Sequence, residues 1–253
     1  LCLELGDAVT LKGGLALELR VARARSTKDV DLRVRGAPDD LLERLRGAAR
    51  RDLGAHLVFT LRPDDRHPEI RNDGMPYDGV RFRAECTLAG KIYGRPFGVD
   101  VAFGDPMLDA PDLVVAEDVL GFAGIAPPTL PLYPVETHLA EKLHAYTLPR
   151  PRVNSRIKDL PDLALLASAG PLVATRVRAA FEQTFTFRGT HPVPAFLPTP
   201  PATWAATYAA LAKEDELSWA SLEEVFVAVS RFVDPVLAGS DERVWDPGGW
   251  RWG

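Results

Sequence analysis

Two aspartates, Asp29 and Asp31, stand two residues apart in a stretch that alternates polar and apolar side chains as far as Val34. This period of two is typical of a half-buried β-strand, where residues two apart point to the same face, so we expect both carboxylates in one place. A second alternating stretch, residues 97–103, carries Asp100 on the face opposite its apolar residues. Together the three carboxylates could supply a triangle of oxygen ligands, and Mg²⁺ prefers a few carboxylates combined with substrate phosphates.

Such a triangle of carboxylates suggests phosphoryl transfer. Two Mg²⁺ ions about 4 Å apart can activate an attacking hydroxyl and stabilise a leaving pyrophosphate. Each part also has a plainer interpretation: Asp29 and Asp31 as the solvated face of an ordinary strand, and Asp100 as a surface carboxylate. The interpretation as a metal site therefore depends on a third feature, a glycine pair near the N-terminus.

Gly13 and Gly14 end a β-branched and apolar stretch at residues 8–12 and precede a run of helix formers that begins at Leu15. The pattern predicts a strand, a glycine turn and a short helix. Glycines let the backbone approach a phosphate closely, and a helix start offers free N–H groups and the positive end of its dipole. A glycine pair alone is a common tight turn, but its place before the two aspartates favours a site for a nucleoside triphosphate.

Basic residues gather at two places along a chain whose net charge is −5. One group surrounds the paired aspartates and the other lies in the C-terminal half: Arg20, Arg23, Arg25, Lys28, Arg33 and Arg35, then Arg150, Arg152, Arg156 and Lys158. A positive rim of this kind would suit a triphosphate or an RNA backbone. The alternative is that these side chains are scattered over the surface and pair with some of the 35 acidic residues.

The whole sequence predicts an α+β fold in two parts. Residues 1–110 mix strands and helices and are expected to form a catalytic core, whereas residues 111–253 are mostly helical and are expected to complete the site. Further strands are predicted at 56–62 and in a hairpin over 79–104, and helices after the Asp39-Asp40 cap and at 135–146, 158–168, 202–213 and 221–237. Prolines predict a stiff connector at 127–134 and an extended strap at 191–201.

Composition limits the class of protein. The hydrophobic fraction of 46% and charged fraction of 26% are those of an ordinary globular chain. No apolar run approaches the roughly 20 residues that cross a bilayer, and no secretion signal is present, so no membrane role is expected. Cys2 and Cys86 form no disulfide or zinc pattern, which favours a reducing cytoplasm.

Three segments resemble the motifs of a known family, the AbiEii/AbiGii nucleotidyltransferase toxins. They are LKGGLAL with RSTKDVDL (residues 11–17 and 25–32), YPVE with AEKLHA (133–136 and 140–145), and SRIKDLPDL (155–163). The resemblance covers residues 9–166. It implies a polymerase-β-like nucleotidyltransferase core with a mixed sheet and an appended, mostly helical half, and the toxin component of a type IV toxin–antitoxin or phage-defence pair.

The resemblance also implies a role for each motif residue. Asp29 and Asp31 are expected to bind Mg²⁺, and Asp100 to be the third metal ligand and the base for the attacking hydroxyl. Lys142 is expected to bind the triphosphate and Asp159 to position Lys142 or the nucleotide. Without the resemblance, Lys142 has the setting of a solvated helix face. Asp159 and Asp162 have that of first-turn carboxylates, which a helix dipole favours.

One position departs from the pattern. Many nucleotidyltransferases carry Ser or Thr after the glycines, but this chain has Leu15, so backbone N–H groups would bind the phosphates without a hydroxyl. The leading hypothesis is a Mg²⁺-dependent nucleotidyltransferase toxin that transfers a nucleotide from a triphosphate to RNA, with the tRNA 3′ end as acceptor and an antitoxin as partner. The alternatives are transfer to a protein or small molecule, and an inactive binding module. Three converging carboxylates argue against inactivity, because without a metal they repel one another.

Overall fold

The alternating stretches around Asp31 and Asp100 form strands of one mixed β-sheet in a computed structural model of the chain. The structure describes residues 2–21, 27–35, 41–51, 56–66, 68–70, 79–118, 121–150, 156–239 and 242–253. Several residues named above lie outside the described parts of the chain: Arg23, Arg25, Ser26, Asp39, Asp40, Arg152 and Ser155.

The chain forms two compact units that interleave along the sequence. The first unit comprises Leu1–Ala16, Thr27–Asp105 and Pro111–Tyr133, and the second comprises Leu17–Ser26, Pro106–Ala110 and Pro134–Gly253. The predicted functional division between residues 110 and 111 stays a prediction.

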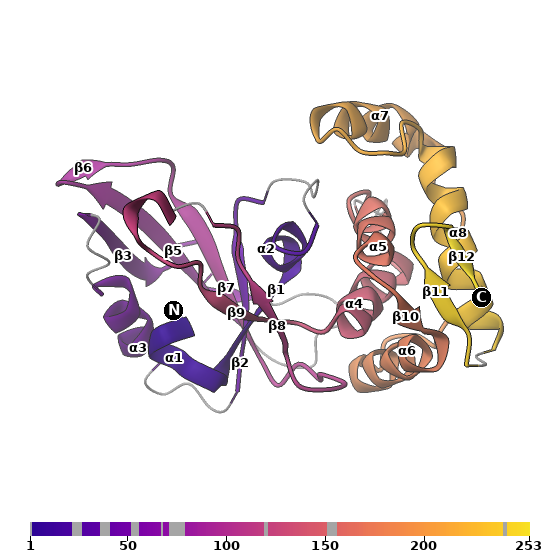
Figure 1. The fold of residues 1–253 in the computed structure, drawn as a ribbon, viewed down its shortest axis with the longest axis horizontal. Coiled ribbons are helices and arrows are strands. Elements are labelled where there is room, and N and C mark those ends of the chain that lie inside the picture. The colour runs from indigo at the N-terminus through magenta and orange to yellow at the C-terminus, as the bar shows by residue number, and fades with distance from the viewer. Residues whose placement is uncertain are drawn as a thin grey trace. The chain divides into compact units, whose positions relative to one another are not determined.

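The described residues of the first unit place nine strands in one sheet, in the order β3-β5-β7-β2-β1-β9-β8, with β4 and β6 paired to β5 (Figure 1). The strands are β1 (Val9–Lys12), β2 (Val30–Val34), β3 (Leu57–Pro63), β4 (Glu69–Ile70), β5 (Gly79–Leu88), β6 (Lys91–Ile92), β7 (Phe97–Phe103), β8 (Asp112–Val115) and β9 (Thr129–Leu132). β2 runs parallel to β7 and antiparallel to β1, while β5 runs antiparallel to β7. The predicted α+β fold with a mixed sheet is confirmed.

The predicted hairpin over residues 79–104 is also confirmed, because β5 and β7 are antiparallel neighbours. β6 is an addition to it that pairs with the end of β5. The proline-rich connector differs from its prediction: its residues 129–132 form β9, which pairs with β8 over four residues and with β1 at Leu132. The sequence did not predict this strand because it contains Pro131, and proline is normally depleted from strand interiors.

The two faces of the sheet differ in polarity, as alternation requires. Leu32, Phe82, Val99 and Val101 are buried on one face. Helix α3 (Leu41–Ala49) packs against β3 with Leu45 fully buried, and Figure 1 shows α1 (Cys2–Leu5) and α3 together on one side of the sheet. The other face carries the charged residues of β2, β5 and β7, which leaves it available for a site.

Two short 3-10 segments, η1 (Gly6–Ala8) and η2 (Gly121–Ala123), complete the first unit, and helix α2 (Gly13–Glu18) begins in it. The second unit contains α4 (Val135–Thr147), α5 (Asp159–Ser168), α6 (Ala174–Arg188), η3 (Ala202–Trp204), α7 (Ala205–Glu214) and α8 (Leu222–Ala238). It also contains a small sheet of β10 (Leu172–Val173), β11 (Val244–Asp246) and β12 (Arg251–Trp252). Helix α6 and this small sheet were not predicted from the sequence.

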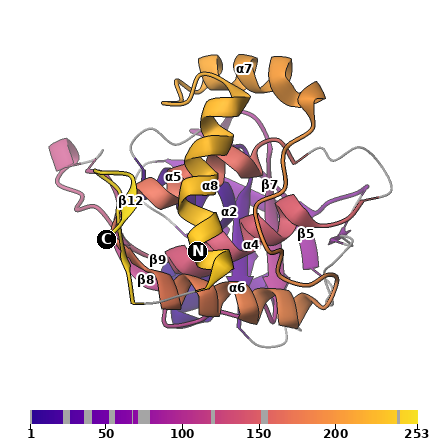
Figure 2. The same cartoon turned by 90° about the vertical axis from the view of Figure 1, so that its right-hand side faces the viewer.

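The core of the second unit is formed where α5 and α6 each pack against α4 and α8 (Figure 2). Trp245 is fully buried and donates a hydrogen bond of 2.8 Å to the carbonyl of Ala167. The extended strap is held by Tyr146, whose hydroxyl donates to the carbonyl of Pro198 at 2.7 Å. In the part of the chain that the structure describes, no helix is both long enough and apolar enough for a membrane span.

Candidate active site

Four charged residues lie at matching positions of four neighbouring strands, and we call them the charged row. Lys12 of β1 is opposite Asp31 of β2, Asp31 is opposite Asp100 of β7, and Asp100 is opposite Arg81 of β5. Neighbouring strands lie about 4.8 Å apart, and like charges directly opposed destabilise a sheet. The central pair of carboxylates therefore needs positive charge nearby, from protein or from a bound cation.

Asp29 lies beside this row, just before β2. Its Oδ1 accepts a hydrogen bond of 3.0 Å from the backbone N–H of Gly98 on β7. A Cβ at Gly98 would lie 2.7 Å from the same oxygen, so the glycine makes room for the carboxylate. The structure thus brings Asp29, Asp31 and Asp100 together across two adjacent parallel strands.

The glycine turn between β1 and α2 lies against Asp31 and Thr27. Gly13 has a φ of +62°, and a Cβ there would lie 1.9 Å from Oδ2 of Asp31. A Cβ at Gly14 would lie 2.7 Å from Oγ1 of Thr27. The predicted strand, glycine turn and helix are confirmed. Both positions require glycine, because a side chain there would collide with Asp31 or Thr27 of the segment RSTKDVDL.

Asp100 is bound by an arginine that the sequence analysis did not single out. Arg81 donates from Nε to Oδ1 at 2.7 Å and from Nη2 to Oδ2 at 2.6 Å, so both oxygens of Asp100 are engaged. These hydrogen bonds raise the pKa of the Arg81 guanidinium against the opposing effect of burial, and the charge of Asp29 adds to the rise. A bidentate arginine–carboxylate pair is among the stronger hydrogen-bonded contacts in proteins.

The other end of the charged row is anchored by a buried acid. Lys12 forms an ion pair with Asp105, whose side chain is fully buried, and the Nε of Arg33 donates to the backbone carbonyl of Asp105 at 2.7 Å. The Lys12 ammonium also lies 5.1 Å from the centre of the Tyr133 ring. Arg33, predicted as part of a basic rim, is therefore used in an internal contact.

In the second unit, Lys142 of α4 is held between two carboxylates of α5. Its Nζ lies 3.2 Å from Oδ1 of Asp159 and 2.7 Å from Oδ2 of Asp162. The side chains of Lys142, Asp159 and Asp162 are 15%, 5% and 0% exposed, so the interpretation of Lys142 as part of a solvated face is wrong. Asp162 was seen in the sequence only as a helix-start charge. Its position three residues after Asp159 on one helix face was the available signal.

A neutral histidine lies one turn before this lysine. His138 is fully buried, and neither ring nitrogen has a hydrogen-bond partner among the residues that the structure describes. Burial, followed by the positive charge of Lys142, lowers the pKa of His138 to about 3. The ring is therefore uncharged at neutral pH.

Comparison with known proteins agrees with these motifs. A family model described as "Nucleotidyl transferase AbiEii toxin, Type IV TA system" matches residues 2–228. The chain belongs to this family. No curated protein matches the sequence significantly.

Solved structures that resemble this AbiEii-family chain include MenT4 and JHP933. MenT4, a nucleotidyltransferase toxin from Mycobacterium tuberculosis H37Rv, is 18% identical and superposes with a TM-score of 0.55 over 96% of this chain and 79% of its own. JHP933 from Helicobacter pylori is 15% identical, with a TM-score of 0.48 over 92% of this chain and 86% of its own. The likeness to MenT4 supports the nucleotidyltransferase fold.

The carboxylates of the family motif suit Mg²⁺ in their chemistry, since they are hard oxygen donors that reach one face from adjacent strands. Among the described residues, no three His, Cys, Asp or Glu side chains are placed to hold a metal ion as they stand. At Asp100, both oxygens are engaged by Arg81. The donor set therefore fits the ion, and a metal bound through Asp100 would share this carboxylate with Arg81.

Proposed function

We propose that this chain is a Mg²⁺-dependent nucleotidyltransferase that transfers a nucleoside monophosphate from a triphosphate to a hydroxyl of RNA, with the 3′ end of tRNA as the acceptor. The observation that carries the proposal is the opposition of Asp31 and Asp100 on adjacent parallel strands, with Asp29 beside them. Membership of a type IV toxin family adds that a cognate antitoxin is its partner.

In the proposed reaction the acceptor oxygen attacks the α-phosphorus of the triphosphate. A new P–O bond forms, the bond from the α-phosphorus to the bridging oxygen of the β-phosphate breaks, and pyrophosphate leaves with that electron pair. Asp29, Asp31 and Asp100 would hold Mg²⁺, which supplies positive charge to the attacking and leaving oxygens. Asp100 also accepts the proton of the hydroxyl.

The chain's own residues position the triphosphate. Gly13 makes room for the carboxylate of Asp31 and Gly14 makes room for Thr27. The backbone N–H groups of this turn would bind the phosphates. We assign Lys142 to the triphosphate, since an ammonium suits phosphate oxygens, and Asp159 and Asp162 to hold it in place.

The test is incorporation of label from each radioactive triphosphate, supplied in turn with Mg²⁺ and total tRNA, by the wild type and Asp31→Asn. We expect label on tRNA from the wild type and at least a hundredfold less from the variant, as for loss of a transition-state charge contact. Asp7→Asn is the matched control, because Asp7 is an exposed acid of the same unit.

The other outcomes separate the alternatives. Equal incorporation by wild type and Asp31→Asn would contradict the mechanism. Label on protein, or on a small molecule added as acceptor, while tRNA stays unlabelled would show a different acceptor. No label on any acceptor, with both proteins folded, would support an inactive binding module.

A further inference from the structure

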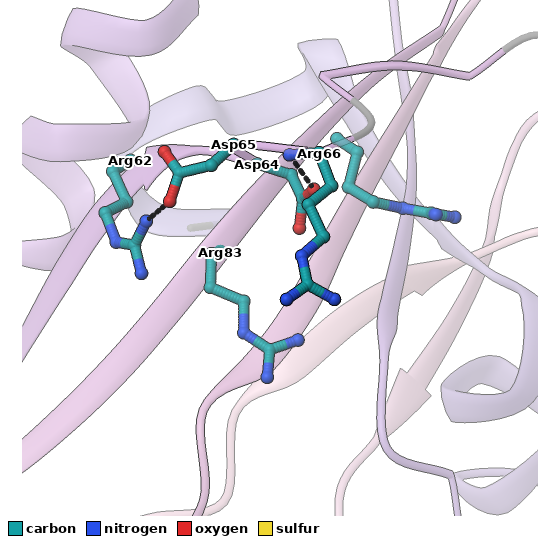
Figure 3. Close-up of a pocket in the computed structure, with 6 residues that line it drawn as sticks. Arg62, Asp64, Asp65, Arg66 and Arg83 are labelled. Carbon is teal, nitrogen blue, oxygen red and sulfur yellow. Dashed lines mark hydrogen bonds and ion pairs between the residues drawn. The ribbon is translucent and has the colours of Figure 1, made fainter.

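A pocket of about 500 Å³ opens on the polar face of the first unit's sheet, where β3 ends beside β5 (Figure 3). Six charged side chains line it: Arg62, Asp64, Asp65, Arg66, Arg81 and Arg83. Four arginines against two aspartates leave this pocket with an excess of positive charge, in a chain whose net charge is −5. We call it the arginine pocket.

Strand register gathers the arginines. Arg81 and Arg83 are two residues apart on β5 and so point to one face, and Arg62 of β3 is directly opposite Arg83. Like charges that lie opposite each other destabilise a sheet, and of these two arginines only Arg62 is neutralised by acidic partners. Arg62 pairs with Asp65 and lies 3.7 Å from Glu85.

Arg83 and Arg66 remain available for a ligand. Neither side chain has an ion-pair partner within the part of the chain that the structure describes, although both line the pocket. Figure 3 shows Arg62 and Arg83 extending from their neighbouring strands toward the same space. Guanidinium groups in this arrangement match phosphate oxygens, which they bind in a two-pronged manner.

We propose that the arginine pocket binds backbone phosphates of the acceptor strand, an inference that rests on the proposed function. The sheet order decides between the two phosphate-bearing substrates. β5 and β3 lie on one side of β7, which carries Asp100, whereas β1 with its glycine turn lies on the other side, beyond β2. Three strand spacings, about 14 Å, separate β5 from β1.

The triphosphate is assigned to the glycine turn, so phosphates in the arginine pocket belong to the substrate that reaches Asp100 from the opposite side. That substrate carries the attacking hydroxyl. Arg81 connects the two places, because it lines the pocket and also holds both oxygens of Asp100. A phosphate bound in the pocket would compete with Asp100 for this guanidinium.

The test measures binding of a short fluorescein-labelled single-stranded RNA to the full chain by fluorescence anisotropy, with EDTA and without triphosphate. Arg66→Gln, Arg83→Gln and the double variant are compared over a series of salt concentrations. For single strands, the slope of log affinity against log salt changes by about 0.7 for each phosphate that the protein no longer neutralises. We therefore expect a slope shallower by about 0.7 in each single variant and by about 1.4 in the double variant.

Two control variants sharpen this test. Arg50→Gln removes the same charge from the exposed residue that follows α3, the helix on the apolar side of the sheet, and should keep the wild-type slope. Arg83→Lys keeps the charge and should restore most of the slope. Thermal unfolding of each variant verifies its fold. A double variant with the wild-type affinity and slope, or an equal loss in Arg50→Gln, would refute the proposal.

A second measurement separates the two substrates and the two proposals. Triphosphate affinity, measured with Mg²⁺ present, should stay at the wild-type value in the double variant. Loss of triphosphate affinity with RNA affinity retained would overturn the assignment to the acceptor. RNA binding that falls as expected, in a protein that labels no acceptor, would uphold the pocket while the proposed transfer reaction fails.

Discussion

At the scale of single residues, the carboxylate of Asp100 has two positive partners, the Arg81 guanidinium and the proposed divalent cation. Arg81 holds both carboxylate oxygens at 2.7 and 2.6 Å, and the proposed divalent cation needs at least one of them. The Arg81 side chain is 38% exposed and that of Asp100 is 18% exposed, so water screens part of their attraction. The pair can therefore open at a modest cost when a phosphate or a metal offers a replacement.

Replacing Arg81 should strengthen binding of divalent ions. Arg81→Gln removes both hydrogen bonds to Asp100, and we expect Mn²⁺, as a probe for Mg²⁺, to bind about tenfold more tightly, which corresponds to ~1.4 kcal/mol. Electron paramagnetic resonance of free Mn²⁺ measures the affinity. Arg83→Gln is the matched control, since it removes an equal charge from the same strand face but no partner of Asp100. An equal gain in both variants would mean that the pair with Asp100 is irrelevant.

Gly13 should be irreplaceable for a geometric reason. Gly13→Ala adds a Cβ 1.9 Å from Oδ2 of Asp31, at a φ of +62° that L side chains rarely adopt. We expect a loss of about 1–3 kcal/mol in unfolding free energy and at least a hundredfold lower transfer activity. Gly94→Ala is the control, because Gly94 has a φ of +74° with nothing within 4 Å of the added Cβ. It should share the strain but keep the activity, and a fully active Gly13→Ala would disprove the link to Asp31.

The sequence was a good guide to the carboxylates but not to their partners. Alternation alone placed Asp29 and Asp31 on one face, since this depends only on neighbours in the chain. The partner of Asp100 depends on which residue of β5 stands opposite it, and a shift by one residue would have replaced Arg81. The burial of Lys142 likewise follows from packing of α4 against α5, which a solvated-looking sequence pattern does not reveal.

At the scale of elements, strands with clear alternation were predicted and those without it were missed. β2, β5 and β7 carry apolar residues on one face and charged residues on the other, so a period of two can be seen in their sequences. β9 contains a proline, and β10 and β12 have two residues each, too few to show a period. Helix α6 was missed because Ala174, Ala180 and Thr184, small or polar residues, occupy part of its buried face.

Helix α8 begins at a cap whose contribution can be measured. Oγ of Ser221 accepts a hydrogen bond of 3.2 Å from the backbone N–H of Glu224, while Oε2 of Glu224 accepts one of 2.8 Å from the backbone N–H of Ala220. Ser221→Ala should lower the unfolding free energy by about 1 kcal/mol in urea denaturation. Ser221→Thr keeps the acceptor and should stay within a few tenths of a kcal/mol of the wild type. A wild-type midpoint for Ser221→Ala would show that water replaces the cap.

At the scale of the whole molecule, the aromatic residues allow the second unit to be followed alone. All five tryptophans belong to it: Trp204, Trp219, Trp245, Trp250 and Trp252. Tyr146 and Trp245 are buried in the core of this unit, and Trp250 and Trp252 pack against the same core. Tryptophan fluorescence during denaturation therefore reports the unfolding of this unit, which also holds the buried histidines.

Those histidines should make the second unit sensitive to acid. The pKa of His138 and that of His144 are each lowered to about 3, mainly by burial, from 6.5 in an unfolded chain. Between these values the unfolded state binds the protons that the folded state excludes. The unfolding free energy is therefore unaffected by these two histidines well above pH 6.5. It falls as the pH drops toward 3, by up to about 1.4 kcal/mol per pH unit for each histidine.

Replacing His138 should remove part of this dependence. Burial is the largest cause of the lowered pKa of His138. The positive charges of Lys142 and Arg20 lower this pKa further, while the negative charges of Glu141 and Asp162 raise it. His138→Leu should reduce the slope of unfolding free energy between pH 6.5 and 5 by about 1 kcal/mol per pH unit, as measured by urea denaturation with tryptophan fluorescence. His56→Gln, at an exposed histidine of the first unit, should leave the slope unchanged. A general loss of packing in His138→Leu would lower the unfolding free energy at every pH, so it would not change the slope. An unchanged slope would show that His138 already carries its proton in the folded chain.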